Sequence, residues 1–203
     1  MEKFMHRFSK LDKIYLDAVP PNGIRIKHVD YFSMKHLYTL TREWLVEEGW
    51  ATRKDEDFPE EFYFQKETQQ WGVELWIWWR HKKNTKNSYY RYLLDIDFHV
   101  LALKQSEIVR NGQKYKVDHA DCEIMIKAKI LSDAEDKWKN HPFLKHFQTI
   151  FWKRINKNIF EGYKRDLYQQ VYRLQETMKS YLQLKTYLPE EEGEQFWLTK
   201  QET

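Results

Sequence analysis

YRYLLDIDFHVLALKQSEIVRNGQKYKVDHADCEIMIKAKIL, residues 90–131, is the stretch that decides the fold. On both sides of Asn111-Gly112 apolar residues recur at every second position, which is the period of a half-buried strand. Asn-Gly between two such runs is a strong turn signal. Residues 90–131 therefore predict a long antiparallel hairpin that turns at Asn111-Gly112.

The loop length of this hairpin sets which side chains share a face. A two-residue turn would place Phe98 opposite Met125 and mix the two faces. A three-residue loop, with Gly112 in the left-handed conformation, places Phe98 opposite Ile124. We prefer the second register because apolar residues then meet on one side. It separates a core face from a second, more polar face.

Segments before the hairpin extend the same pattern. Residues 62–65 and 73–80 alternate with a period of two, which predicts two further strands. Ser33 is a good N-cap and Gly49 a good terminator, so the apolar spacing between them predicts a helix at about 34–48. Four strands in sequence make an antiparallel meander.

After the hairpin the period returns to that of a helix. An apolar stripe runs from Phe143 to Ile159, Gly162 interrupts it, and a second stripe continues from Leu167 to about Leu188, where Pro189 ends it. We expect these helices to cover the core face of the sheet. The predicted fold class is α+β: an antiparallel meander of four or slightly more strands, with an N-terminal helix and long C-terminal helices on one face.

Length and composition fit one domain with two arms. The chain has 203 residues, an aromatic share of 17% and a net charge of +3, so global disorder is excluded and the charge does not indicate a polyanionic partner. We expect an N-terminal arm at 1–29, one domain at 30–188 and an acidic tail at 189–203. One cysteine excludes an internal disulfide, and without an export signal or spanning segment we expect a cytoplasmic protein.

Three sequence features stand out in order along the chain: the helix end at 44–49, the strand running into the turn at 109–112, and the segment 133–151 with Trp138 and Pro142. Together they resemble a family of uncharacterised archaeal proteins, many from small-genomed lineages. The resemblance covers roughly residues 30–188 and implies no activity, because that family has no established function. A looser architectural likeness is to helix-grip folds, in which a curved sheet holds a long C-terminal helix.

Large apolar residues on the second face point to an interaction surface. Such residues need a covering element, which the N-terminal arm or a second subunit would supply. Our first functional hypothesis is a non-enzymatic interaction or assembly protein that docks a protein partner or self-associates. Its candidate partner-binding residues are Trp76, Trp78, Leu93, Leu101, Phe196, Trp197 and Leu198.

Two alternatives use other parts of the chain. A small-molecule or lipid carrier would hold its ligand between sheet and helix, against Tyr92, Phe98 and Ile126. An RNA- or ribosome-binding protein would use the basic loop between two aromatic pairs. The candidate nucleic-acid residues in that loop are Arg80, Lys82, Lys83 and Lys86. A membrane-bound role for the amphipathic segment after Phe143 is less favoured than core packing.

Acidic and histidine residues on the second face are the types that bind metals or transfer protons. A solvated sheet face also places polar residues at every second position. We therefore predict that the protein has no metal site and no cofactor and is not an enzyme. A hydrolase is the least favoured of the hypotheses. Phosphate-binding loops and hydrolase motifs are absent from the sequence. The weak metal candidates are Asp97, His99, Asp121 and Glu123.

Overall fold

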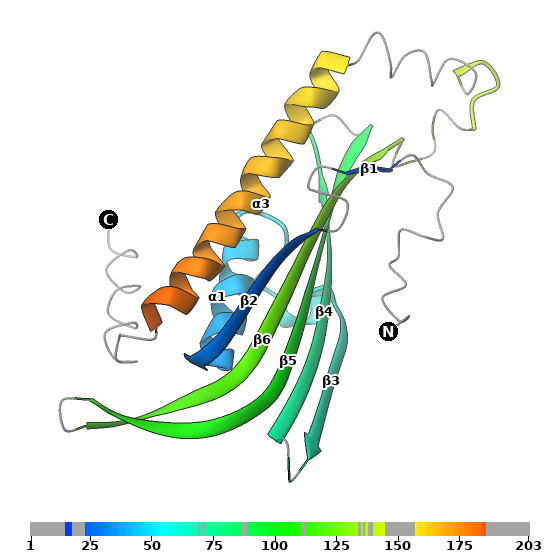
Figure 1. Cartoon of the computed structure of the whole chain (residues 1–203). Helices are drawn as coiled ribbons and strands as arrows, with labels where there is room; N and C mark the ends of the chain where they lie inside the picture. Colours follow the sequence, from blue (N-terminus) through cyan, green and yellow to red (C-terminus); the bar gives the residue numbers. More distant parts are fainter. Residues whose placement is uncertain are drawn as a thin grey trace. The chain divides into compact units, whose positions relative to one another are not determined.

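The computed structural model describes residues 15–17, 23–68, 70, 72–86, 89–110, 113–133, 135, 137, 140–144 and 157–185. The chain is α+β, with an antiparallel sheet (Figure 1). Its elements in order are β1 (Tyr15–Asp17), β2 (Ile24–Phe32), α1 (Met34–Glu47), the 3-10 turn η2 (Asp55–Asp57), β3 (Glu60–Thr68), β4 (Gly72–Asn84), β5 (Tyr90–Arg110), β6 (Gln113–Ser132) and α3 (Lys157–Lys185).

The sheet has six strands in the order β1-β6-β5-β4-β3, and β2 also pairs with β6. The consecutive neighbours β3 to β6 form the predicted meander. Strand β2 runs from Ile24 to Phe32, so the end of the expected N-terminal arm, residue 29, lies inside a strand. The turn at Asn111-Gly112 lies outside the described residues, so the loop length stays a prediction.

The chain divides into two compact units. The first unit comprises Met1–Ile24, Arg80–Asp95 and Ile126–Tyr172, and the second comprises Arg25–Trp79, Ile96–Met125 and Arg173–Thr203. The divisions fall inside β2, β4, β5, β6 and α3, so each of these elements contributes residues to both units. Among the described residues, no helix is long and apolar enough to cross a membrane.

Helix α1 forms where its caps and its apolar spacing predict it. The Ser33 hydroxyl accepts a hydrogen bond from the His36 amide at 3.4 Å, and Leu37 and Leu45 are fully buried. Gly49 has a φ of +70°, the left-handed conformation in which glycine ends a helix without strain. The predicted helix at 34–48 is confirmed.

Trp79 is fully buried in the core of the second unit. Its ring meets those of Tyr38 and Phe58 at 4.9 Å and that of Phe98 at 5.1 Å, edge to face. The Trp79 indole and the Tyr38 hydroxyl both donate to Glu60 Oε2, at 2.9 and 2.8 Å. Burial, followed by this carboxylate, raises the pKa of Tyr38. These bonds hold the start of β3 against the core.

The C-terminal helix differs from the sequence prediction. Helix α3 runs through Gly162 without a break. The exposed glycine lowers helix stability by about 1 kcal/mol, but the burial of five other residues along the helix outweighs this loss. Those residues are Leu167, Val171, Leu174, Met178 and Leu182. The first predicted helical stripe lies largely in 145–156, outside the described residues. Within the described residues after β6, α3 is the one helix.

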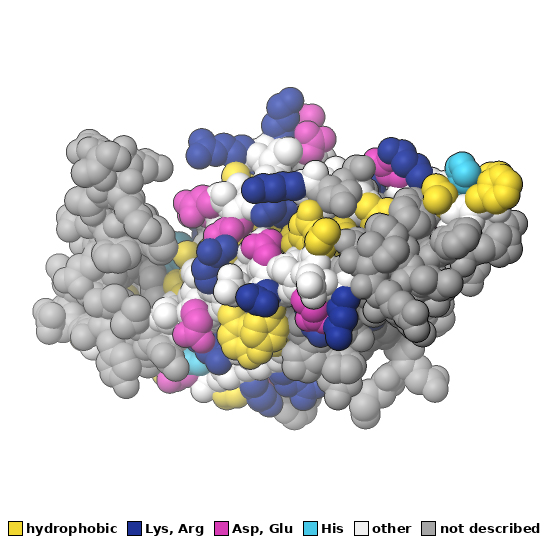
Figure 2. Space-filling view, turned by 90° about the horizontal axis from the view of Figure 1, so that it is seen from above, with side chains coloured by type: hydrophobic (Ala, Val, Ile, Leu, Met, Phe, Trp, Pro, Cys, Tyr) yellow, Lys and Arg dark blue, Asp and Glu magenta, His cyan; other side chains and the backbone are white. Residues whose placement is uncertain are grey.

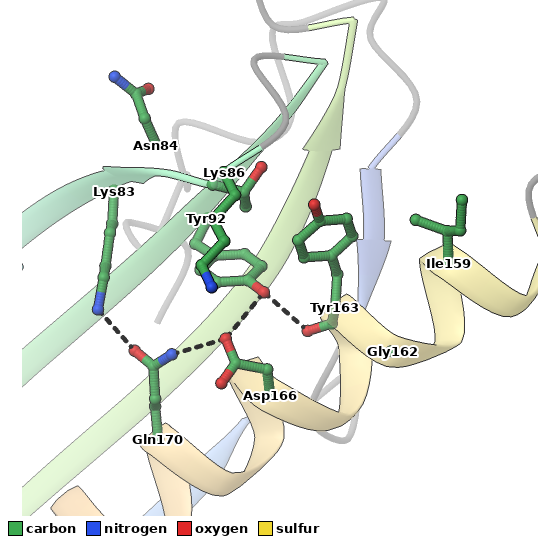
Figure 3. A pocket seen from close by; sticks show the side chains of 10 residues that line it. Lys83, Asn84, Lys86, Tyr92, Ile159, Gly162, Tyr163, Asp166 and Gln170 are labelled. Carbon is green, nitrogen blue, oxygen red and sulfur yellow. Dashed lines mark hydrogen bonds between the residues drawn. The ribbon is translucent and has the colours of Figure 1, made fainter.

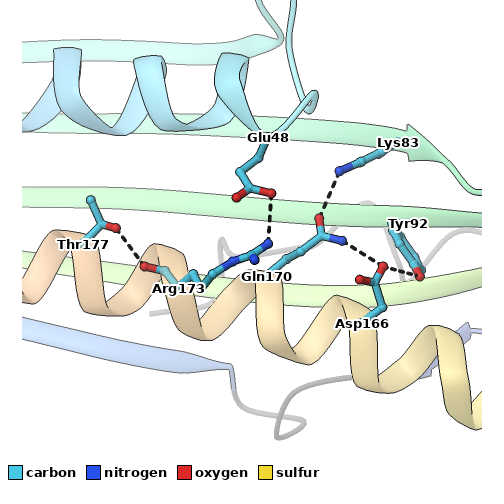
Figure 4. A network of polar contacts seen from close by, with 7 residues as sticks. All are labelled: Glu48, Lys83, Tyr92, Asp166, Gln170, Arg173 and Thr177. Carbon is cyan, nitrogen blue, oxygen red and sulfur yellow. Dashed lines mark hydrogen bonds and ion pairs between the residues drawn. The ribbon is translucent and has the colours of Figure 1, made fainter. Parts of the chain in front are cut away.

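Within the second unit, the later part of α3 lies beside α1. Tyr181 donates its hydroxyl hydrogen to the Ser33 carbonyl at 2.9 Å, and Arg173 pairs with Glu48 at 3.0 Å (Figures 1 and 4). Both bonds link α3 to an end of α1. The N-terminal and C-terminal helices of this unit are therefore packed together.

Candidate functional site

Strands β3 and β4 present aromatic side chains on the second face of the second unit. In β4, Leu75, Ile77 and Trp79 are buried, whereas the residues between them face the other way. The β3–β4 register places Phe62 opposite Trp78 and Phe64 opposite Trp76, so these four side chains share that face. We call them, together with His99, the aromatic surface.

The rings of the aromatic surface form two contacting groups. Phe62 lies 4.5 Å from Trp78 and 6.2 Å from Phe64, measured between ring centroids. Trp76 stacks on His99 at 3.6 Å with an interplanar angle of 23°. Because Phe64 lies opposite Trp76, the two groups of rings lie side by side and form a strip across β3, β4 and β5.

Glu74 orders one end of the strip. Its Oε1 accepts a hydrogen bond from the Trp76 indole at 2.9 Å and lies 3.3 Å from Nε2 of His99. Both bonds favour the carboxylate, and they lower the pKa of Glu74 from its ordinary value. The stacked Trp76 and His99 rings are thereby fixed by one anionic oxygen.

Part of the aromatic surface is open to solvent. Phe62 is 37% exposed, Phe64 is 44% exposed, and Tyr63 between them is 52% exposed on the opposite face. Trp76 and Trp78 are half-buried, because their neighbours' rings cover them. Large apolar side chains grouped in this way commonly mark a binding surface.

The other partner-binding candidates lie in different surroundings. Leu101 is exposed in the second unit, whereas Leu93 is buried in the first. The candidate residues Phe196, Trp197 and Leu198 lie outside the described residues. Sequence reasoning missed Phe62 and Phe64 as candidates, since their alternation with Tyr63 and Gln65 resembles that of an ordinary strand and does not show that β3 ends the sheet.

The acidic and histidine candidates do not converge. Asp121 pairs with Lys27 at 3.1 Å, and Glu123 pairs with Arg25 at 3.0 Å, as cross-strand contacts between β6 and β2. His99 belongs to the aromatic surface, and Asp97 is buried. Within the described part of the chain, no group of three or more histidine, cysteine or acidic side chains has the geometry to hold a metal ion.

The first unit contains a pocket of about 440 Å³ between the β4–β5 connection and α3 (Figure 3). Its wall combines two lysines and two tyrosines with smaller groups. The lining residues are Lys83, Asn84, Thr85, Lys86, Tyr92, Ile159, Gly162, Tyr163, Asp166 and Gln170. Most of these residues are polar or charged, and Tyr92, Tyr163 and Ile159 supply the apolar part of the wall, so the pocket suits a small polar ligand.

A chain of hydrogen bonds fixes the floor of this pocket. The Tyr92 hydroxyl lies 3.0 Å from Asp166 Oδ2 and 3.1 Å from the Tyr163 carbonyl, and Gln170 donates to the same carboxylate oxygen at 2.9 Å. Lys83 donates to Gln170 Oε1 at 3.1 Å (Figure 4). Burial and then the Asp166 charge raise the pKa of Tyr92, so its hydroxyl stays a donor.

Some of the residues predicted for the carrier and for nucleic-acid binding line the pocket, and others do not. Tyr92 lines the pocket, whereas Phe98 and Ile126 are fully buried and are not part of its wall.

Of the basic candidates, Lys83 and Lys86 line the pocket and Lys82 is exposed, while Arg80 is buried with its Nε 3.9 Å from Asp95 Oδ2. On the face seen in Figure 2, basic and acidic side chains are interspersed, unlike the dense basic face of a polyanion-binding protein.

No family model matches the chain, and no curated protein or solved structure matches it either. The resemblance to an archaeal family and the likeness to helix-grip folds therefore stay predictions. Any function has to be inferred from the aromatic surface and the pocket themselves.

Proposed function

We propose that this chain is a non-enzymatic interaction protein that docks a protein partner through β3 and the aromatic surface of its second unit. One observation carries the proposal: three consecutive aromatic residues, Phe62, Tyr63 and Phe64, are exposed on the last strand of the sheet. Burying an exposed aromatic side chain against a partner contributes 1.5 kcal/mol or more, at about 25 cal/mol per Å².

The composition of the surface supports this use. Protein interfaces are enriched in tryptophan, tyrosine and phenylalanine, and their strongest contacts sit in a cluster rimmed by polar groups. Trp76 and Trp78 occupy the centre of such a cluster here, and Glu74 lies at its edge. Because the rings already pack on one another, little side-chain freedom is lost on binding.

The test is affinity capture from the protein's own cells, with quantitative mass spectrometry. Phe64→Glu puts a charge in the exposed strip without touching the core, and Phe143→Glu is the matched control because Phe143 is also an exposed phenylalanine. We expect Phe64→Glu to lose a defined partner, or a second copy of the chain, that Phe143→Glu retains. Identical capture by both variants would remove the proposal.

A second candidate function, binding of a small anionic ligand, is favoured by the pocket of the first unit. Lys83 and Lys86 give the pocket a net positive charge against the single carboxylate of Asp166, and the Tyr163 ring offers a flat apolar wall. This candidate keeps the carrier hypothesis but moves the ligand to the pocket, which shares only Tyr92 with the cavity predicted from the sequence.

Native mass spectrometry of the purified full-length chain tests this candidate. We expect a bound anionic mass that Lys86→Glu abolishes and Lys82→Glu, a neighbouring lysine outside the pocket wall, leaves unchanged. Equal loss in both variants would indicate contact with a polyanion such as RNA, and an apo mass for the wild type would count against the pocket.

A further inference from the structure

Strand β3 ends the sheet. In the order β1-β6-β5-β4-β3 it pairs with β4 on one side, and among the described residues no strand pairs with its other side. A strand edge of this kind presents a row of backbone donors and acceptors that can template a further strand. The side chains from Glu61 to Glu67 are all exposed.

The middle of β3 lacks the protection that edge strands normally carry. Natural edges are usually blocked by charged residues, proline or a covering element. Strand β2, also at the margin of the sheet, has Arg25 and Lys27 in this role, both engaged with acidic residues of β6. In β3 the four central residues 62–65, Phe-Tyr-Phe-Gln, carry no charge.

Of the antiparallel registers centred on Tyr63, Phe64 and Gln65, the first makes β3 complementary to itself. With Tyr63 on the two-fold axis, Phe62 lies opposite Phe64 of the second copy, twice, and Glu61 lies opposite Gln65. With Phe64 on the axis, Glu61 instead faces Glu67, and like charges directly opposite are destabilising. With Gln65 on the axis, Phe64 faces Lys66 and the aromatic pairs are lost.

We infer that the partner is a second copy of this chain, whose β3 adds to β3 in an antiparallel pair centred on Tyr63. The inference rests on the proposed function and names its partner. The pairing extends the sheet from one copy to the next and joins the two aromatic surfaces, because Phe62 and Phe64 of each copy flank the junction on the same face as Trp76 and Trp78.

Cysteine cross-linking tests the register in the full chain. A residue on the two-fold axis lies about 5 Å from its counterpart between Cα atoms, within disulfide range, whereas a residue one step away lies about 8 Å from its own. We expect Tyr63→Cys to form a covalent dimer on mild oxidation and Phe64→Cys to form little. Tyr172→Cys on α3 is the control for random collision, because Tyr172 is similarly exposed.

A charge change provides a second, independent readout. Because Gln65 faces Glu61 twice in this register, Gln65→Lys should tighten the dimer by about 2- to 30-fold and Gln65→Glu should weaken it, measured by sedimentation at several concentrations. Both substitutions are on an exposed strand position, so folding is preserved; circular dichroism checks this.

The outcomes separate this inference from the proposed function. A monomer at all concentrations, or cross-linking of Tyr63→Cys no greater than that of Tyr172→Cys, overturns the second-copy inference. If Phe64→Glu still loses a different protein in the capture experiment, the docking function stands with another partner. If neither experiment responds to β3, both are wrong.

Discussion

At the scale of single residues, the side chains on the second face behave differently from one another. Glu74 gathers Trp76 and His99 around one oxygen, whereas Asp121 and Glu123 neutralise the basic residues of β2. The acidic and histidine residues that looked alike in the sequence therefore have separate roles. Their alternation along the strands shows which face they occupy, and cross-strand neighbours decide what each one contacts.

Replacing Glu74 by glutamine should produce a pH-dependent loss of stability. The folded-state pKa of Glu74 is lowered, so the carboxylate stabilises the fold above its unfolded-state pKa, and this stabilisation is lost as the pH falls through the folded-state value. Near neutral pH we expect Glu74→Gln to cost about 1 kcal/mol or less, because the carboxylate is partly solvated.

Urea midpoints of wild type and Glu74→Gln across the acid range measure this difference. The two proteins should converge in strong acid, where Glu74 is protonated in both states. Glu67→Gln, at an exposed carboxylate on β3, is the control. A difference between wild type and Glu74→Gln that is the same at every pH would contradict the assigned role of the charge.

The Cys122 thiol should be inert in the folded protein. It is buried, and burial, followed by the nearby Asp121 and Glu123 charges, raises its pKa to about 12. The reactive thiolate is therefore scarce and inaccessible. A colorimetric thiol assay should detect no reaction in native buffer and one thiol per chain in denaturant. A fast reaction in native buffer would show that β6 opens locally, and would require Cys122→Ala in the cross-linking experiment.

At the scale of elements, caps and buried stripes decide where helices run. Helix α1 begins after Ser33 and ends before Gly49, as its sequence predicts. In α3 the same kind of argument fails at Gly162. Propensity is a local penalty of about 1 kcal/mol, and the packing of several buried side chains outweighs it.

Two glycine-to-alanine substitutions should change stability in opposite directions. At Gly162 a Cβ meets nothing within 4 Å on an exposed helix face, so alanine should stabilise by about 0.5–1 kcal/mol. At Gly72 φ is +85°, and a Cβ would lie 2.8 Å from the Leu103 carbonyl oxygen, so alanine should destabilise by about 1 kcal/mol or more.

Thermal or urea unfolding of both variants beside the wild type provides the measurement. The substitution is chemically identical at the two sites, so the pair is its own control. Destabilisation by Gly162→Ala would mean that the glycine is needed for the pocket wall or for a break in α3, as the sequence had indicated.

At the scale of the whole chain, the two units are interleaved along the sequence. Each is assembled from three separate segments, and β2, β4, β5, β6 and α3 each pass from one unit to the other. Cutting the chain at a unit boundary would therefore divide a strand or a helix. Neither unit corresponds to a continuous piece of sequence that could be expressed alone.

Unfolding should accordingly be a single transition. Because the two units share strands and a helix, unfolding of one unit would truncate elements of the other. We therefore expect both units to unfold together. Urea unfolding followed by far-ultraviolet circular dichroism and by tryptophan fluorescence should give coincident curves. Two separated transitions, with the fluorescence change confined to one of them, would show that the units unfold independently.

The sequence by itself determined the local structure and the identity of the core face. Period-two alternation located the strands and assigned Phe98, Ile124 and Ile126 to the interior, where the structure has them, because side chains of a strand point alternately to its two sides. The caps of α1 were equally readable, since a cap is a contact between residues a few positions apart.

Only the tertiary structure decided which strand ends the sheet and which parts of the second face are covered. Phe64 and Leu93 follow the same alternation in the sequence, yet Phe64 is exposed and Leu93 is buried. The difference depends on contacts between segments far apart in the chain, which a local pattern does not encode. The candidate docking surface comes from that long-range placement, and its aromatic composition is the part that the sequence already contained.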